Sequence, residues 1–348
     1  MYSKNKIKNA GKTFKSKETQ TPEKIQEASD VLTYWRSIHG KMIEKFQECL
    51  IKKSLEIDSK AIIAKRLKRT PSIVKKLRRL NHIQLSSMQD IAGLRVVVYS
   101  IPKVKRLVKA LKSNDFAQKL KNEDDYIVQP KESGYRGIHL VFVYRDEDNP
   151  ELDGLLVEVQ VRTVVQHAWA TAVETMGTYL NTQLKFNEGK QKWLKYFALT
   201  SSAFSFVEKT NQLTKYAHLS EFETYNQAVY EFRYNQIEIK LNAFSQVSNA
   251  ICEKEELNGK YNLVLLDIKK KYVNIEVFEP ERLDEANVRY TDLEKEYSNN
   301  DNFQVALVST ENIQELRDAY PNYFLDTHLF MKKMAIVQRR FDKIKKSA

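Results

Sequence analysis

The sequence has little cysteine, glycine or proline, and each shortage excludes a class of protein. Two cysteines, Cys49 and Cys252, stand among 348 residues. They are too few for a disulfide framework or for a four-ligand zinc site. Nine glycines and seven prolines exclude a fibrous or linker-dominated chain. With 42% hydrophobic and 29% charged residues, the composition is that of a globular protein able to bury a core.

Long hydrophobic runs are also absent. No stretch approaches the roughly 20 apolar residues that a membrane-spanning helix needs. The N-terminal residues MYSKNKIKNAGKTFKSK carry the positive charge of a signal peptide, but no apolar run follows them. The sequence therefore predicts a cytoplasmic protein.

Charge is distributed unevenly along the chain. The formal net charge is +12, and residues 1–80 hold 21 Lys and Arg against 8 Asp and Glu. Residues 281–318 have the opposite balance, with ten acids against four bases. A basic front end favours a polyphosphate or nucleic-acid partner, and a later acidic segment can compete for the same surface. Solvated helix faces are the alternative interpretation of both segments.

Hydrophobic periodicity predicts an α+β protein with a basic arm (residues 1–25), a first domain (26–215) and a second domain (220–348). Three- and four-residue spacing indicates helices, and runs of β-branched or aromatic residues indicate strands. In the first domain the predicted helices are 22–55, 70–80, 104–120, 164–180 and 193–207, and the predicted strands are 94–99, 138–144 and 155–161. In the second domain we expect helices at 221–257, at 284–297 and after Pro321, and strands at 261–268, 272–278 and 303–308.

The strand at 155–161 and the residues just after it carry the most informative polar pattern. Alternate side chains of a strand share a face, so Glu158, Gln160 and Arg162 line up opposite three valines. An acid, an amide and a guanidinium on one surface can form a site. A half-solvated strand is the other interpretation of the same alternation.

Two more segments place charges at the ends of predicted elements. Asp90 precedes a glycine-assisted entry into a strand, where a carboxylate is a natural ligand for a hard cation such as Mg²⁺. The segment 66–76 gathers cations and a hydroxyl around a helix N-terminus, which makes a plausible phosphate cradle. The sequence contains neither a Walker loop nor a kinase glycine-rich loop. Any ATP phosphates would therefore be held by side chains and a helix end.

A glycine-flanked tyrosine and a helical histidine complete the candidates. Tyr135 stands in a turn between Gly134 and Gly137, where its ring can stack on a base. His167 and Glu174 are seven residues apart and share one face of a predicted helix. His167 and Glu174 can equally be structural polar groups whose hydrogen bonds are satisfied within the protein.

The order of these motifs resembles the RelA/SpoT synthetase domain, the alarmone-synthetase family, over about residues 30–210. The motifs are the basic helix start, Asp-Ile-Ala-Gly-Leu-Arg, Gly-Tyr-Arg-Gly-Ile-His, Glu-Val-Gln-Val-Arg-Thr and Gln-His-Ala-Trp-Ala. The resemblance implies a nucleotidyltransferase-like synthetase domain with a mixed β-sheet flanked by helices. It also implies an enzyme that moves the β,γ-pyrophosphate of ATP onto a ribose 3′-hydroxyl and releases AMP.

By position, the resemblance implies three groups of site residues. The ATP-binding group is Arg66, Lys68, Ser72, Lys76 and Arg95. The catalytic and metal-binding group is Asp90 and Glu158. The acceptor-binding group is Tyr135, His139, Gln160, Arg162 and His167. The two arginines would stack on adenine, Glu158 would take the proton of the 3′-hydroxyl, and Mg²⁺ would be the cofactor.

The chain also departs from the family pattern in two places. Many small alarmone synthetases have a Glu-His pair where Glu174 is followed here by Thr175. No His-Asp dipeptide occurs anywhere, so the metal hydrolase domain of the long family members is not expected. We therefore expect synthesis without hydrolase activity.

Nearly the whole chain resembles the CapRel group, fused toxin–antitoxin members of this family. The motifs are Tyr2-Ser3-Lys4, Trp35 to His39, and Ala319 to Thr327. The resemblance implies a C-terminal α/β pseudo-zinc-finger domain without metal ligands, whose Tyr320 and Tyr323 block the adenine site. Core packing of both tyrosines is the alternative.

CapRel-like proteins modify the tRNA 3′ CCA end and are released by a phage capsid protein in antiviral defence, so the resemblance implies these partners here. Two other functions remain open from the sequence. One is a (p)ppGpp synthetase with GDP or GTP as acceptor, and the other is a catalytically inactive tRNA or RNA binder.

Overall fold

The computed structural model describes residues 2–16, 20–113, 116, 118–180, 184, 189, 191–234, 237, 241, 261–267, 269–270, 272–297, 300, 302–309 and 327–347. The chain forms two compact units. The first is Met1–Val96, Lys105–Asp124 and His139–Val161, and the second is Val97–Val104, Asp125–Ile138 and Arg162–Ala348. This division does not fall near residue 220, so the three domain boundaries expected from the sequence stay a prediction.

The first unit begins with two helices, α1 (Lys4–Lys15) and α2 (Pro22–Ile57). Within the basic arm expected over residues 1–25, α1 is a packed helix that buries Ile7, Ala10 and Phe14, and the sequence did not predict this helix. These apolar positions recur at three- and four-residue steps among the lysines, which gives the helix one buried face. Helix α2 starts where the Thr21 side chain accepts from the backbone of Lys24.

A five-stranded sheet has the order β1-β2-β5-β4-β3. Its strands are β1 (Ile62–Leu67), β2 (Ala92–Val98), β3 (Lys119–Asp125), β4 (Ile138–Val143) and β5 (Leu156–Thr163). Helix α2 covers one face, where the Phe46 ring lies 5.7 Å from that of Phe142 and 5.5 Å from that of Phe116. Because successive strand residues alternate, His139 on β4 lies on the face opposite Phe142.

Two strands of this sheet were not expected from the sequence. Strand β1 was missed, and so was β3, whose first two residues fall at the end of the helix expected over 104–120; that helix in fact ends earlier, as α4 (Ile101–Leu111). The sequence of β3, KLKNEDD, has no apolar alternation because the strand lies at the edge of the sheet. The strands β2, β4 and β5 and the helix α3 (Thr70–Arg79) confirm their predictions.

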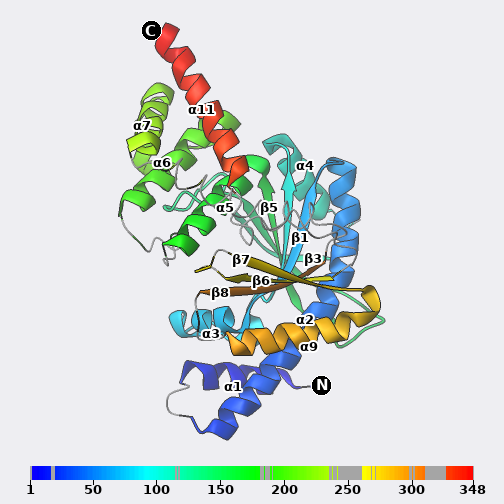
Figure 1. Ribbon diagram of the computed structural model, residues 1–348. Helices are drawn as coiled ribbons and strands as arrows, with labels where there is room; N and C mark the ends of the chain where they lie inside the picture. The colour runs from blue at the N-terminus through cyan, green and yellow to red at the C-terminus, as the bar shows by residue number, and fades with distance from the viewer. Residues whose placement is uncertain are drawn as a thin grey trace. The chain divides into compact units, whose positions relative to one another are not determined.

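Among the described residues of the second unit, four helices pack together. They are α5 (Val164–Tyr179), α6 (Gln191–Glu208), α7 (Glu221–Tyr234) and α11 (His328–Ser347), and Figure 1 shows the C-terminal helix α11 lying along α7 and α6. The Phe330 ring of α11 lies 5.7 Å from that of Phe204 on α6. Within the part of the chain that the structure describes, every helix is too short or too polar to cross a membrane.

A three-stranded antiparallel sheet, ordered β7-β6-β8, also lies in the second unit. Its strands are β6 (Tyr261–Asp267), β7 (Tyr272–Phe278) and β8 (Phe303–Ser309), and α9 (Leu283–Glu296) packs on it through Ala286 and Leu293. Short 3₁₀ turns occur at Leu85–Ser87, Thr214–Tyr216 and Pro280–Arg282. The strands and α9 confirm their predictions, while the pseudo-zinc-finger character of this region stays a prediction.

Candidate active site

The backbone places the first two charged candidates side by side. The Lys68 amide donates to the carbonyl of Ile91, at 2.8 Å, so the residue after β1 lies beside the residue before β2. Arg36 of α2 is buried and fixes this loop, because its Nε donates to the Lys68 carbonyl at 3.1 Å and its Nη1 donates to the Thr70 hydroxyl at 3.0 Å. Sequence analysis assigned no role to Arg36, although it stands in the Trp35–His39 motif.

Asp90 is held between two lysines. Lys68 Nζ lies 3.0 Å from its Oδ2, and Lys76 Nζ lies 2.8 Å from its Oδ1. Burial opposes ionisation of Asp90, but the two ammonium groups outweigh it and lower its pKa. Burial also lowers the pKa of Lys68, and the Asp90 charge counteracts that effect only in part. Asp90 is therefore an ionised carboxylate in a cationic setting.

Helix α3 supplies Lys76 and Ser72 from one side. The two residues are four apart, so they share a face next to the buried pair Ile73 and Leu77. Ser72 lies in the first turn of α3, where free backbone N–H groups point outward. Ser72 and Lys76 thus share the helix face that meets Asp90, and their role as a phosphate cradle stays a prediction.

Glu158 of β5 forms the second carboxylate position. His139 Nδ1 lies 3.0 Å from its Oε1, and Gln160 donates to its Oε2 at 2.7 Å. Burial raises the pKa of Glu158, but the His139 hydrogen bond and charge, the Gln160 hydrogen bond and the Lys76 charge lower it to about 2. The alternation predicted for β5 is confirmed, because Val157, Val159 and Val161 are all fully buried.

Lys76 connects the two carboxylates. It pairs with Asp90 directly, and its charge also lowers the pKa of Glu158. Mg²⁺ in phosphate-transfer sites takes one or two carboxylates, and substrate phosphates complete its ligands. Asp90 and Glu158 fit that donor set. Among the described residues, no three Asp, Glu, His or Cys side chains gather into a metal site of their own.

The two candidate adenine-binding arginines come from neighbouring strands. Lys65 of β1 pairs with Glu44 of α2, so its neighbour Arg66 points to the opposite face of the sheet. Arg66 is exposed, and its charge acts on Lys68. Arg95 is half-buried on β2 between the buried Leu94 and Val96. Stacking of either guanidinium on adenine stays a prediction.

The candidate acceptor residues in the second unit gather around Tyr135. The Arg162 guanidinium donates to the Tyr135 hydroxyl at 2.9 Å and lies 4.9 Å from its ring centroid. Tyr126 meets the same ring edge-on at 5.9 Å, and Lys131 Nζ lies 5.3 Å from its centroid. His167 is buried in α5, with 2% of its surface exposed, so its contact with an acceptor stays a prediction. The predicted autoinhibitory Tyr320 and Tyr323 lie outside the described residues.

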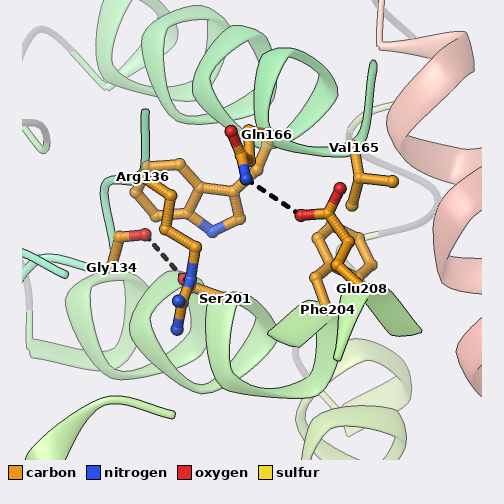
Figure 2. A pocket seen from close by; sticks show the side chains of 8 residues that line it. Gly134, Arg136, Val165, Gln166, Ser201, Phe204 and Glu208 are labelled. Carbon is orange, nitrogen blue, oxygen red and sulfur yellow. Dashed lines mark hydrogen bonds between the residues drawn. The ribbon is translucent and has the colours of Figure 1, made fainter. Parts of the chain in front are cut away.

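A pocket lined by both neighbours of Tyr135 in the sequence was not foreseen from the sequence. It is lined by Gly134, Arg136, Val165, Gln166, Trp169, Ser201, Phe204 and Glu208, and Figure 2 shows Arg136 reaching past Ser201 into it. Its residues come from segments about 65 positions apart, as the Arg136–Ser201 hydrogen bond shows. The unusual run of serines in a buried helix was the available signal, and it did not identify the loop as a partner.

The cationic pairs and ionised carboxylates define a site suited to binding and neutralising phosphates. The comparisons with known proteins point the same way. Residues 65–183, which include both carboxylates, match the family model described as "Region found in RelA / SpoT proteins".

Two curated relatives are similar to part of the chain. The chain is 41% identical over 112 residues to the protein named GTP pyrophosphokinase YjbM of Bacillus subtilis (strain 168), covering 30% of this chain and 51% of that protein. It is 31% identical over 124 residues to GTP pyrophosphokinase YwaC of the same organism, covering 34% and 59%. The chain thus spans about half the length of these relatives. The crystal structure of small alarmone synthetase 1 from Bacillus subtilis aligns at a TM-score of 0.44 and 26% identity, covering 52% of this chain and 93% of that one.

Proposed function

We propose that the protein is an ATP-dependent pyrophosphokinase that transfers the β,γ-pyrophosphate of ATP to a ribose 3′-hydroxyl. The observation that carries the proposal is the set of paired charges Lys68–Asp90–Lys76 and His139–Glu158, which lies inside the segment matching the RelA/SpoT model. The names of the two curated relatives support the same reaction class.

In the proposed reaction the 3′-oxygen forms a bond to the β-phosphorus of ATP while the bond from that phosphorus to the α,β-bridging oxygen breaks. AMP leaves, and the proton of the hydroxyl passes to Glu158. The carboxylate is ionised at neutral pH because its pKa is about 2. Phosphoryl-type transfer needs positioning and charge neutralisation more than covalent help, and Lys68 and Lys76 supply the positive charge.

Asp90 and Glu158 would hold Mg²⁺ in this proposal. The ion would neutralise charge that develops on the phosphates. In the structure both Asp90 oxygens are paired with ammonium groups, so Lys68 and Lys76 are placed to turn toward incoming phosphates when a cation takes Asp90.

For the acceptor we propose the 3′ CCA end of tRNA. The excess positive charge lies within residues 1–80, and a wide basic surface favours a polyanion over a free nucleotide. GDP or GTP is the alternative acceptor, which would make the protein a (p)ppGpp synthetase. Both relatives are named GTP pyrophosphokinases, which favours this alternative.

We also propose that the protein is a fused toxin–antitoxin that stops translation in antiviral defence. Its C-terminal region would hold the synthetase inactive through Tyr320 and Tyr323 until a phage capsid protein releases it. This proposal rests on the motif Ala319–Thr327. Hydrolase activity is not part of it.

The test uses the full chain and its Tyr323→Ala variant with γ-labelled ATP, offered tRNA, GDP or GTP. Label on tRNA, increased by Tyr323→Ala, is the expected result. Label on GDP or GTP, equal in both proteins, would select the alternative acceptor and remove the autoinhibition. Glu158→Gln in the Tyr323→Ala background is the control, because it should abolish labelling of every acceptor.

A further inference from the structure

The loop that carries Tyr135 is in close contact with helix α6 at Gly134. This glycine has a φ of 98°, a left-handed conformation that side chains rarely adopt. A Cβ atom there would lie 2.8 Å from the Ser201 Cβ and 2.9 Å from the Trp169 ring. The loop therefore lies directly on α5 and α6, at a distance only glycine permits.

Ser201 fixes the loop on both sides of Tyr135. Its hydroxyl donates to the Gly134 carbonyl at 2.6 Å and accepts from Arg136 Nε at 2.9 Å. Figure 2 shows Gly134 and Arg136 on either side of this hydroxyl. Since Tyr135 lies between these two residues in sequence, one side chain holds both of its neighbours, Gly134 by the backbone carbonyl and Arg136 by the guanidinium.

Burying the charged Arg136 guanidinium costs free energy, which suggests that the residue has a role in holding the loop. Its side chain is only 4% exposed, and among the described residues its two terminal nitrogens have no hydrogen-bond partner. Burial lowers its pKa to about 10, which still leaves it charged, and Glu208 on the same pocket attracts it. The cavity has a volume of about 10 Å³, far below the range of nucleotide-sized sites, so it is a support and not a substrate site.

We propose that Ser201 and Arg136 are positioning residues that hold the Tyr135 ring for stacking on the base of the acceptor. Neither touches the acceptor, and both act through the backbone of the loop. The proposal rests on the proposed function in one respect, namely that Tyr135 binds the acceptor base. The ligand class it concerns is a nucleobase, whether in tRNA or in a guanosine nucleotide.

We call the two hydrogen bonds of the Ser201 hydroxyl, to Gly134 and Arg136, the anchor of the loop. Ser201→Ala tests this anchor, and Ser205→Ala is the matched control. Ser205 lies one turn further along α6 and is also fully buried, but its hydroxyl donates to the Ser202 carbonyl of its own helix. Amide hydrogen exchange is measured at Gly134 and Lys131, whose N–H groups bond within the loop. We expect exchange about tenfold faster in Ser201→Ala and unchanged in Ser205→Ala. Equal exchange in both variants would overturn the anchor.

Steady-state kinetics of the full chain then tests whether the anchor acts through Tyr135. Ser201→Ala should raise the KM for the acceptor about five- to tenfold, while the KM for ATP and kcat stay within twofold. In a Tyr135→Ala background the same change should have no further effect, because the ring that it positions is gone. Additive effects, or an equal rise in the KM for ATP, would show a structural role only. Arg136→Lys keeps the buried charge and should fall between wild type and Ser201→Ala.

The hydrogen-exchange and kinetic experiments together separate failure of this inference from failure of the proposed function. If wild-type protein transfers pyrophosphate to no acceptor, the proposed function fails, while hydrogen exchange still decides whether Ser201 anchors the loop. If wild-type protein is active and Ser201→Ala changes neither exchange nor acceptor KM, only the positioning role is overturned.

Discussion

Glu158 and Glu208 are both largely buried, but their surroundings shift their pKa values in opposite directions. Glu158 accepts from His139 and Gln160 and feels the Lys76 charge, and its pKa falls to about 2 despite burial. Glu208 accepts from the hydroxyl of Thr163 and the amide of Gln166, and burial raises its pKa. Arg136 and Lys333 attract Glu208, but this attraction does not outweigh burial.

The contrast separates a reactive site from a support. Asp90 is paired with two lysines, and Glu158 accepts from His139 and Gln160 and is near the Lys76 charge, all of them side chains that a metal ion or a phosphate can replace. Around Glu208 the hydrogen-bond partners are the neutral, buried side chains of Thr163 and Gln166. Burial alone therefore does not identify a functional carboxylate, whereas exchangeable cationic partners do.

Of the changes predicted here, replacing Glu158 should reduce pyrophosphate transfer the most. Glu158→Gln keeps the shape of the side chain but removes the charge that accepts a proton and holds a cation. We expect pyrophosphate transfer to fall about 10²- to 10⁴-fold, measured with γ-labelled ATP and the best acceptor. Glu44→Gln is the control, because Glu44 pairs with Lys65 on the opposite face of the sheet. More than a tenth of wild-type activity in Glu158→Gln would refute its catalytic role.

Lys76 should show the next largest effect. Lys76→Gln removes the cation that pairs with Asp90 at 2.8 Å and whose charge also acts on Glu158. Because a hydrogen bond between charged groups contributes about 1.5–3 kcal/mol, kcat/KM for ATP should fall roughly 10- to 100-fold. Lys75→Gln makes the same charge change at an exposed neighbour on α3 and should leave kcat/KM within twofold. Equal losses in the two variants would indicate a general effect of charge.

Local pattern predicted the reactive region well. The alternation on β5 placed Glu158 and Gln160 opposite three valines, and the structure confirms it. A helix was predicted to begin at residue 70, where α3 does begin, and Lys76 follows on that helix. What local pattern did not give was the pairing with Asp90, because it depends on hydrogen bonds between β1 and β2, and β1 was not recognised.

The supporting pocket could not be predicted, for a physical reason. Gly134 has a function only because α6 brings Ser201 against it, and such a close approach leaves no periodicity in either segment. Helix α1 was missed for a different reason. Its lysines suggested a basic arm, although Ile7, Ala10 and Phe14 have the spacing of a helix. High charge concealed an amphipathic helix that the same rules would have found.

Comparing Gly134 with Gly154 isolates the contribution of the packing between the Gly134 loop and α6. Gly134 and Gly154 both have positive φ, at 98° and 80°, but a Cβ at Gly154 would meet nothing within 4 Å. Gly154→Ala should cost about 1 kcal/mol in free energy of unfolding, for backbone strain alone. Gly134→Ala should cost about 1–2 kcal/mol more, because its Cβ collides with Ser201 and Trp169. Urea unfolding measures both, and equal costs would mean that the loop does not rest on α6.

The pH dependence of stability should separate the two glutamates in sign. The pKa of Glu158 is lower in the folded protein than its ordinary 4.5, so its contribution is present above that value and is lost as pH falls. Between pH 7 and pH 4, wild type should lose about 1 kcal/mol more than Glu158→Gln in urea unfolding. The pKa of Glu208 is raised, so its ionised form costs stability at neutral pH and protonation relieves that cost. Wild type should therefore gain stability relative to Glu208→Gln as pH falls. Parallel curves for all three proteins would contradict the opposite environments on which the comparison rests.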